Sequence, residues 1–256
     1  MKIRVLGAHN VESDKTGFAS FLIDDVLAID ASALTSSLSF DEQQKLKAVL
    51  LTHQHHDHIR DIPALGMNFY LLKNTIEIYS TRPVYEALSA HLLNNVLYPN
   101  FMEKPTEKPA IRFNIIEPGR TESIAGYEIL PVSVNHAVPT VGYQITSTDG
   151  KKMFITSDTG PGLADCWRQV SPHLLLIDLT LLNKDDKFAH QSGHLTPALL
   201  QQELISFREI RGYLPKVVLT HLNPLVEKDI KAEISIVEKA LKIKITFGRE
   251  GMKINI

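Results

Sequence analysis

The feature that most constrains this chain is a group of potential metal ligands packed into six residues. The segment His53-Gln54-His55-His56-Asp57-His58 has the pattern H-x-H-x-D-H and directly follows the apolar stretch Ala48–Leu51, which we expect to be a buried strand. If the chain stays extended beyond that strand, positions 53, 55 and 57 project to one side, and a turn can bring His58 to the same place. Imidazole with carboxylate suits zinc, iron or manganese. The segment therefore predicts two neighbouring cation sites, with His53 and His55 in one and Asp57 and His58 in the other.

Four donors on one loop do not complete two sites, so further ligands must come from elsewhere. Three candidates each follow a short apolar stretch of the expected strand type: His136, Asp158 and His221. Taken alone, a histidine at a strand end is more often a simple polar terminus. Together with the motif, these three are the donors that two sites still need.

Composition places the chain among ordinary globular proteins. It has 256 residues, 44% of them hydrophobic, with 27 basic and 29 acidic side chains and a net charge of −2. There is no basic excess for gripping a long nucleic acid. A chain of this length buries a large core without help, so a bound metal is expected to be chemical rather than structural.

The order of elements predicts an α/β (α+β) fold of two mixed sheets with helices outside, formed by residues 1–256 as one domain. Short strands come first in each half, and amphipathic helices follow. We expect helices at 41–47 and 83–93, a helix beginning with the Thr196 cap and Pro197, and a strand at 243–247. No apolar run is long enough to span a membrane, and the N-terminal run is too short for a secretory signal. We therefore expect a cytoplasmic protein. Its single cysteine, Cys166, cannot form an internal disulfide.

In its order of ligands the chain resembles the metallo-β-lactamase fold superfamily, whose fold is a four-layer αβ/βα sandwich. The resemblance covers essentially the whole chain. It implies a first metal on His53, His55 and His136, a second on Asp57, His58 and His221, and Asp158 as a bridge between them. Relatives that cleave β-lactams carry cysteine at the bridging position. An aspartate there indicates hydrolysis of phosphodiesters or esters instead.

Two cations about 3.5–4 Å apart can share a hydroxide, but the leaving alkoxide also needs a proton. His194, in Gly193-His194-Leu195-Thr196-Pro197, is our candidate general acid, and Asp178 at the end of an apolar strand could orient it. We also count Asp57 among the catalytic residues. The alternatives are that His194 is a polar residue at a helix start and that Asp178 merely ends its strand.

Five other histidines are less informative, and His173 among them is expected to have only a surface or packing role. His9 could line the pocket and His190 could touch a substrate, although a surface or packing role is favoured for both. His56 occupies a variable slot of the motif and is not expected to be a ligand. His91 is expected to decorate a helix.

Three segments further resemble class II cyclic-nucleotide phosphodiesterases: 93–101, 157–161 and 193–197. This resemblance implies hydrolysis of 3′,5′-cyclic AMP or GMP to the 5′-monophosphate, with two divalent ions, Zn²⁺ first and Mn²⁺ or iron as alternatives. A homodimer is compatible with it. Tyr98 and Phe101 could offer an aromatic face to a base, or could equally anchor a proline-bent loop in the core. The chain departs from the family at Gln54 and His56.

Other functions stay open at this point. An RNase Z-like nuclease would need a basic surface, but the basic residues of 104–112 are interspersed with Glu103 and Glu107. A lactonase or another ester hydrolase could use the same core. A non-hydrolytic di-iron sensor is the alternative outside hydrolysis. We expect a small cyclic nucleotide as the partner, with no long nucleic acid and no membrane.

Overall fold

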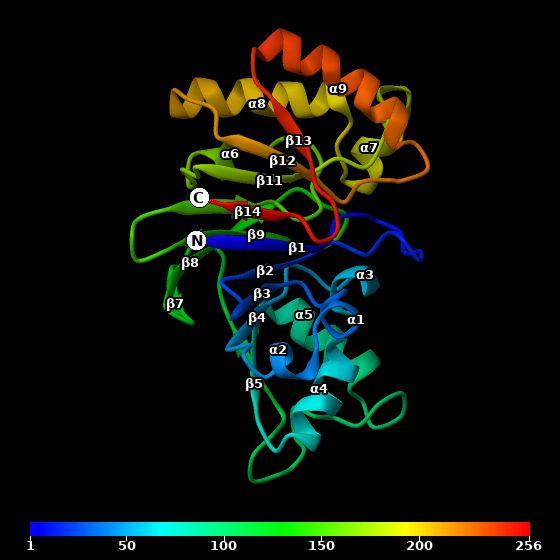
Figure 1. Cartoon of the computed structure of the whole chain (residues 1–256), viewed down its shortest axis with the longest axis vertical. Coiled ribbons are helices and arrows are strands. Elements are labelled where there is room, and N and C mark those ends of the chain that lie inside the picture. The colour runs from blue at the N-terminus through cyan, green and yellow to red at the C-terminus, as the bar shows by residue number, and fades with distance from the viewer.

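Two seven-stranded sheets lie face to face at the centre of the molecule (Figure 1). The structure is a computed structural model that describes residues 1–256. The first sheet has the order β14-β1-β2-β3-β4-β5-β6. Its strands are β1 (Lys2–Gly7), β2 (Ser20–Ile23), β3 (Leu27–Ile29), β4 (Ala48–Leu50), β5 (Ile76–Ser80), β6 (Ile111–Ile115) and β14 (Lys253–Asn255).

The second sheet has the order β13-β12-β11-β10-β9-β8-β7. Its strands are β7 (Glu122–Ile124), β8 (Tyr127–Val134), β9 (Thr140–Thr146), β10 (Lys152–Ile155), β11 (Leu174–Asp178), β12 (Lys216–Thr220) and β13 (Ile245–Phe247). Both sheets mix parallel and antiparallel pairs, since β3 to β6 and β10 to β13 are parallel runs.

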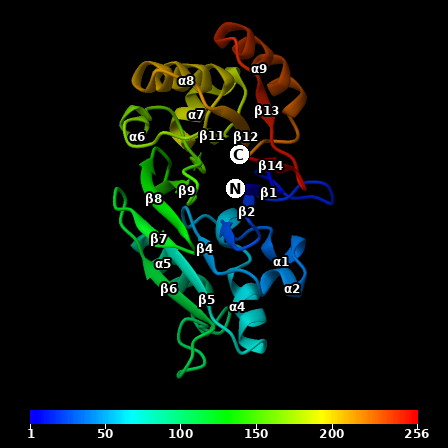
Figure 2. The same cartoon turned by 60° about the vertical axis from the view of Figure 1, so that its left-hand side comes forward.

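Helices cover the outer face of each sheet, which completes four layers (Figures 1 and 2). On the first sheet lie α1 (Leu34–Ser37), α2 (Phe40–Gln43), α3 (His56–Ile59), α4 (Ile62–Leu71), α5 (Arg82–Ala87) and the π-helical turn Leu88–Leu92. The second half contributes α6 (Ala164–Trp167), the 3₁₀ turn Asn183–Asp185, α7 (Asp186–Ser192), α8 (Pro197–Arg211) and α9 (Glu227–Leu241). The predicted α/β sandwich with helices outside is confirmed.

Three apolar cores hold these layers together. The middle one lies between the sheets and includes Phe21, Ile29 and Tyr143, all fully buried. A second joins the outer face of the second sheet to α6, α8 and α9, and a third joins the first sheet to α1 and α4. Burial of apolar surface on this scale is the main force that fixes the two sheets relative to each other.

Helix α8 shows how the sequence sets an element boundary. The Thr196 side chain accepts a hydrogen bond from Leu199 N, Pro197 occupies the first turn, and Gly212 ends the helix with φ +79°. Each residue suits its position, because the N-cap needs a side-chain acceptor and the C-cap a left-handed backbone. The predicted start of this helix is confirmed.

Several sequence-based boundaries were wrong. The helix expected at 41–47 is only α2, which has a Ser39–Glu42 capping box at its start and ends at Gln43. The helix expected at 83–93 is α5 followed by a π-helical turn. The strand expected at 243–247 begins at Ile245, because Lys242 adopts a left-handed conformation after α9. The last strand, β14, crosses to the first sheet and pairs with β1.

The topology brings several strand ends to one edge of the sandwich. Strands β10, β11 and β12 are parallel, and β8 runs in the same direction because both β8 and β10 pair antiparallel with β9. Their carboxyl ends therefore meet at one edge of the second sheet. Residues that follow such strand ends often form the binding site of an α/β protein. None of the helices is both long and apolar enough to cross a membrane.

Candidate metal centre

All seven predicted ligands come together at this edge. They form two groups that share Asp158, and within each group the ligand atoms lie within 4.8 Å of one another. The first group is His53, His55, His136 and Asp158, and the second is Asp57, His58, Asp158 and His221. The division matches the one that the resemblance implied.

Distances between the donor atoms suit a small cation. Asp158 Oδ1 lies 3.3 Å from His58 Nε2, and Asp158 Oδ2 lies 3.4 Å from His221 Nε2 and 3.7 Å from His53 Nε2. Two ligands about 2.0–2.1 Å from a tetrahedral zinc ion are themselves about 3.3–3.4 Å apart. The spacing is that of donors facing a common centre.

Three buried atoms of the groups are left without a hydrogen bond of good geometry, although two of them, His58 Nε2 and Asp158 Oδ1, lie 3.3 Å apart. They are His53 Nε2, His58 Nε2 and Asp158 Oδ1. A buried polar atom without a partner costs about 1–3 kcal/mol, so native proteins seldom leave several together. All three atoms belong to residues of the two ligand groups, and cations held by those groups would satisfy all of them. The residues therefore fit a divalent metal pair.

The backbone of the motif differs from the extended segment that we expected. The chain is extended only as far as His55, and His56–Ile59 form the helical turn α3, in which His58 N donates to His55 O over 3.0 Å. Asp57 and His58 therefore project from a helix rather than from alternate sides of a strand. This geometry directs both toward the second group, with Asp57 in the first turn, where the helix dipole favours a carboxylate.

Partners behind the ligands fix the imidazole rings. His58 Nδ1 donates to Asp30 Oδ2 over 2.7 Å, and Asp30 also accepts from Thr52 N at 2.9 Å. His136 Nδ1 donates to Gly193 O over 2.8 Å. Such contacts set the tautomer and leave Nε2 free for a metal. Sequence reasoning missed Asp30, although it follows an apolar strand just as the predicted ligands do.

Burial and the neighbouring charged side chains both shift the pKa values of the histidines and carboxylates in the two groups. Burial lowers the pKa of His53, His55 and His136, which favours the neutral form that a metal needs. Burial alone would lower the pKa of His221, but the carboxylates around it, led by Asp158, outweigh burial and raise that pKa to about 10. Burial would raise the pKa of Asp158, yet the neighbouring imidazoles of His221 and His58 hold it well below its usual value.

His194 and Asp178 lie beside the two groups. His194 Nδ1 is 3.3 Å from Asp178 Oδ1, and the His194 ring is centred 5.1 Å from the rings of both His136 and His221. Its Nε2 has no hydrogen-bond partner in the chain, and its side chain is 15% exposed. Burial would lower the pKa of His194, but the Asp178 carboxylate outweighs it and raises that pKa. Asp178 also lies 3.1 Å from His221 Nδ1, so one carboxylate contacts a ring of the second group and the candidate acid.

The lesser histidines lie outside the two groups. His56 and His91 are exposed, and the side chain of His190 is 53% exposed with Nδ1 on Asp186 O. His9 is buried and contacts Glu250 rather than any predicted ligand.

Phe101 does not offer an aromatic face to a ligand. It is 2% exposed, packs in the core under α4, and lies close to Gly66. Tyr98 is partly buried against the same core, with its ring 6.0 Å from that of Phe101. Of our two interpretations of this stretch, the core anchor is correct for Phe101, because burial leaves no ring surface for stacking.

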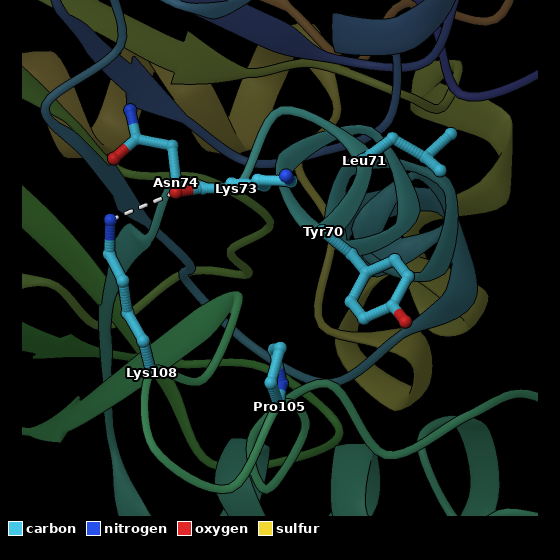
Figure 3. Close-up of a pocket in the computed structure, with 6 residues that line it drawn as sticks. All are labelled: Tyr70, Leu71, Lys73, Asn74, Pro105 and Lys108. Carbon is cyan, nitrogen blue, oxygen red and sulfur yellow. Dashed lines mark hydrogen bonds between the residues drawn. The ribbon is translucent and has the colours of Figure 1, made fainter.

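A separate hollow of about 380 Å³ lies between the end of α4 and the loop around Pro105 (Figure 3). Its lining residues are Tyr70, Leu71, Lys73, Asn74, Pro105 and Lys108. Lys108 Nζ donates to Lys73 O over 2.9 Å, so this lysine satisfies a backbone carbonyl just beyond the end of α4. None of the seven predicted ligands lines this hollow, and it is not part of the metal centre.

Residues 20–222 match the family model of the beta-lactamase superfamily domain. The chain belongs to this superfamily. No curated protein matches it. The metallo-beta-lactamase fold protein YhfI from Bacillus subtilis is 22% identical, with a TM-score of 0.75 over 99% of this chain and 98% of that one.

Two further solved structures share this superfamily fold. Unliganded yeast PDE1 is 15% identical, with a TM-score of 0.85 over 100% of this chain and 99% of that one. The short form of human tRNase Z (ELAC1) is 18% identical, with a TM-score of 0.71 over 100% and 99%. At such identities the likeness establishes the metallo-β-lactamase fold, and the chemistry must be argued from the residues of this chain.

Proposed function

We propose that this chain is a dinuclear, metal-dependent phosphodiesterase that hydrolyses 3′,5′-cyclic nucleotides to 5′-monophosphates. The observation that carries the proposal is the position of His194. Its ring lies beside a histidine of each group, His136 and His221, and its Nε2 is free. A proton donor placed beside both cation sites suits a reaction in which one bond to phosphorus forms and another breaks.

The proposed ligand sets are those described above. His53, His55, His136 and Asp158 would hold one ion, and Asp57, His58, Asp158 and His221 the other. When bound, two such ions supply a water molecule of lowered pKa and neutralise the charge of a phosphodiester. Zn²⁺ is the first candidate, because imidazole and carboxylate donors suit it, with Mn²⁺ or iron as alternatives.

The protein's own part in the reaction is to deliver a proton. Hydrolysis adds the oxygen of one water molecule to phosphorus and breaks the bond from phosphorus to O3′, which must gain a proton as it leaves. In our proposal His194 Nε2 gives that proton, while Nδ1–H stays on the Asp178 carboxylate. Asp178 thereby holds the tautomer in which Nε2 faces the substrate.

A small substrate is supported by charge and by likeness. The net charge of −2 offers no electrostatic grip on a long nucleic acid. The 93–101 stretch resembles cyclic-nucleotide phosphodiesterases, and the TM-score with yeast PDE1, 0.85, exceeds the 0.71 with human tRNase Z.

The test is hydrolysis of 3′,5′-cyclic AMP and cyclic GMP by protein loaded with Zn²⁺ or Mn²⁺, with products separated by chromatography. We expect 5′-monophosphates from wild type and a loss of about 10²–10⁴-fold in His194→Ala, the range for one general acid. His190→Ala is the matched control, because this histidine lies nearby in α7 but its side chain is 53% exposed. No turnover by protein that holds two ions would refute the substrate assignment. Cleavage of a tRNA precursor in its place would favour a nuclease.

A further inference from the structure

The segment that carries His221 has a backbone conformation that needs support. His221 has φ +56°, in the left-handed region, and it is buried. A residue with a Cβ pays about 1–2 kcal/mol there, and such strain persists only where the surroundings hold it in place. Thr180 Oγ1 supplies part of this support by donating to His221 O over 2.8 Å.

The other part comes from the loop that follows β1. Leu222 N donates to Ala8 O over 3.0 Å, and Asn10 N donates to Leu222 O over 3.1 Å. His9 lies between these two contacts and forms a parallel bridge with Leu222. Figure 1 shows the loop after β1 and the segment after β12 at the same end of the sandwich. Both backbone polar groups of Leu222, the residue after His221, are therefore hydrogen-bonded to residues 8–10.

One carboxylate oxygen holds residues 8–10 in turn. Glu250 Oε1 accepts from Ala8 N at 3.1 Å, from Gly17 N at 3.0 Å and from His9 Nδ1 at 2.6 Å. The His9 side chain is only 6% exposed. Burial would raise the pKa of Glu250, but the hydrogen bonds, led by that from His9, lower it, so the group is a carboxylate. Hydrogen bonds to an ionised acceptor are the stronger kind.

Glu250 belongs to the turn that connects the two sheets. The turn leaves β13 in the second sheet and enters β14 in the first. At its start Gly248 N donates to Leu219 O, and a Cβ on Gly248 would lie 2.7 Å from that oxygen. At its end Gly251 N donates to Val5 O over 2.8 Å. The backbone of the turn that carries Glu250 is therefore attached to both sheets, close to the His221 segment.

We propose that Glu250 and His9 are positioning residues for the second metal site, because they hold the loop that fixes the His221 backbone. This site draws Asp57 and His58 from the first sheet and Asp158 and His221 from the second. Any movement between the sheets at this point separates its donors. The first site also takes donors from both sheets, but none of them lies on the segment that this link holds, because His221 is not among them. We therefore expect the first site to depend less on this link. The inference rests on the metal pair of the proposed function and not on the substrate.

The test counts metal ions at a series of buffered free Zn²⁺ concentrations by elemental analysis. Wild type is expected to bind two ions. Glu250→Ala is expected to keep one ion at wild-type affinity and to bind the second about 10–100-fold more weakly, the range for partners behind a ligand. His221→Ala gives the reference for loss of the second site, and the spectra of Co²⁺-loaded variants show whether the retained ion is the same. Glu250→Gln keeps the shape and one oxygen acceptor, so a smaller loss at the same site is expected.

Tyr127→Phe controls for loss of stability alone. Tyr127 OH donates to Asp24 Oδ2 over 2.6 Å and joins the second sheet to the first away from the predicted ligands. This variant should lower the unfolding free energy yet bind two ions as wild type does. Equal weakening of both ions, an unchanged second ion in folded Glu250→Ala, or a wild type that binds fewer than two ions would each overturn the inference. Full loading without phosphodiesterase activity would refute the proposed function and leave this inference standing.

Discussion

The imidazole of His194 stacks on that of His221, with ring centroids 5.1 Å apart and planes inclined by 12°. Both rings present Nδ1 to the same atom, Asp178 Oδ1, at 3.3 Å and 3.1 Å. The proposed acid and the last predicted ligand are therefore oriented by one buried carboxylate. A change in that carboxylate must affect both.

Asp178→Asn should reduce hydrolysis about 10–100-fold at saturating metal, the range for groups that orient a ligand or a catalytic histidine. Asp178 Oδ1 faces the two Nδ1 atoms, while Oδ2 accepts from Leu195 N at 2.9 Å. Asparagine has only one oxygen, so whichever way it turns, its NH₂ meets a donor. Steady-state kinetics should show the loss in kcat.

Asp186→Asn is the matched control for this prediction. Asp186 lies 3.8 Å from His190, and both of these side chains are more than half exposed. An exposed aspartate–histidine pair contributes little, so this variant should hydrolyse at the wild-type rate. An unchanged kcat in Asp178→Asn would contradict the orienting role.

Much of the site could be predicted from sequence because its residues obey one local rule. His136, Asp158 and His221 each follow an apolar strand, and strands that run in the same direction bring their ends to one edge. The motif of 53–58 supplied the remaining four donors within six residues. Neither inference needed tertiary contacts. The assignment of His136 and His221 to different groups came instead from the family resemblance, and the structure groups these residues in the same way.

The predictions that failed depended either on contacts between distant residues or on a short helical turn that the sequence pattern did not indicate. Asp30 becomes a partner of His58 only because β3 and β4 are neighbours in the first sheet, with Ile29 beside Leu50. The expected extended conformation at Asp57 was wrong because α3 begins directly after His55. The sequence is equally compatible with Phe101 as a ligand contact or as a core residue, and only its packing under α4 decides between the two roles.

Asp30→Asn should weaken metal binding at the second site about 10–100-fold, because His58 loses the charged partner that orients it. Asp30 is 1% exposed and accepts from His58 Nδ1 and from Thr52. Competition with a metal chelator, followed by elemental analysis, measures the effect. Binding of both ions at wild-type affinity would refute this role for Asp30.

Glu42, which lies away from the metal centre, should make the stability of the fold depend on pH. It completes the capping box of α2 with Ser39 and pairs with Arg4 at 2.8 Å, and these hydrogen bonds, led by that from Arg4, lower its pKa from 4.5 to about 2. A carboxylate with a lowered folded-state pKa stabilises the fold above pH 4.5 and loses that contribution as the pH falls toward 2.

Glu42→Gln should therefore cost about 1 kcal/mol of unfolding free energy at pH 7, since the pair is partly exposed. The difference from wild type should shrink between pH 4.5 and about 2. Urea denaturation at several pH values measures it. Asp41→Asn is the control, because Asp41 lies in the same helical turn, is exposed and has no ion pair. A difference that stays constant with pH would show that charge at Glu42 contributes nothing.

Gly193→Ala tests how tightly the backbone surrounds the proposed acid. Gly193 has φ +70°, and a Cβ there would lie 2.7 Å from His136 Cα and 3.0 Å from His136 Nδ1. Gly212 has a similar φ of +79° at the end of α8, but nothing lies within 4 Å of its Cβ position. Both alanines pay about 1–2 kcal/mol for the left-handed backbone, yet only the first must displace His136 and the adjacent His194. We expect a larger loss of unfolding free energy in Gly193→Ala, because it adds the clash with His136 to the backbone cost that both variants share. Hydrolysis should fall at least about tenfold in Gly193→Ala and stay unchanged in Gly212→Ala. Equal activity in the two variants would mean that the chain around His194 can move without affecting catalysis.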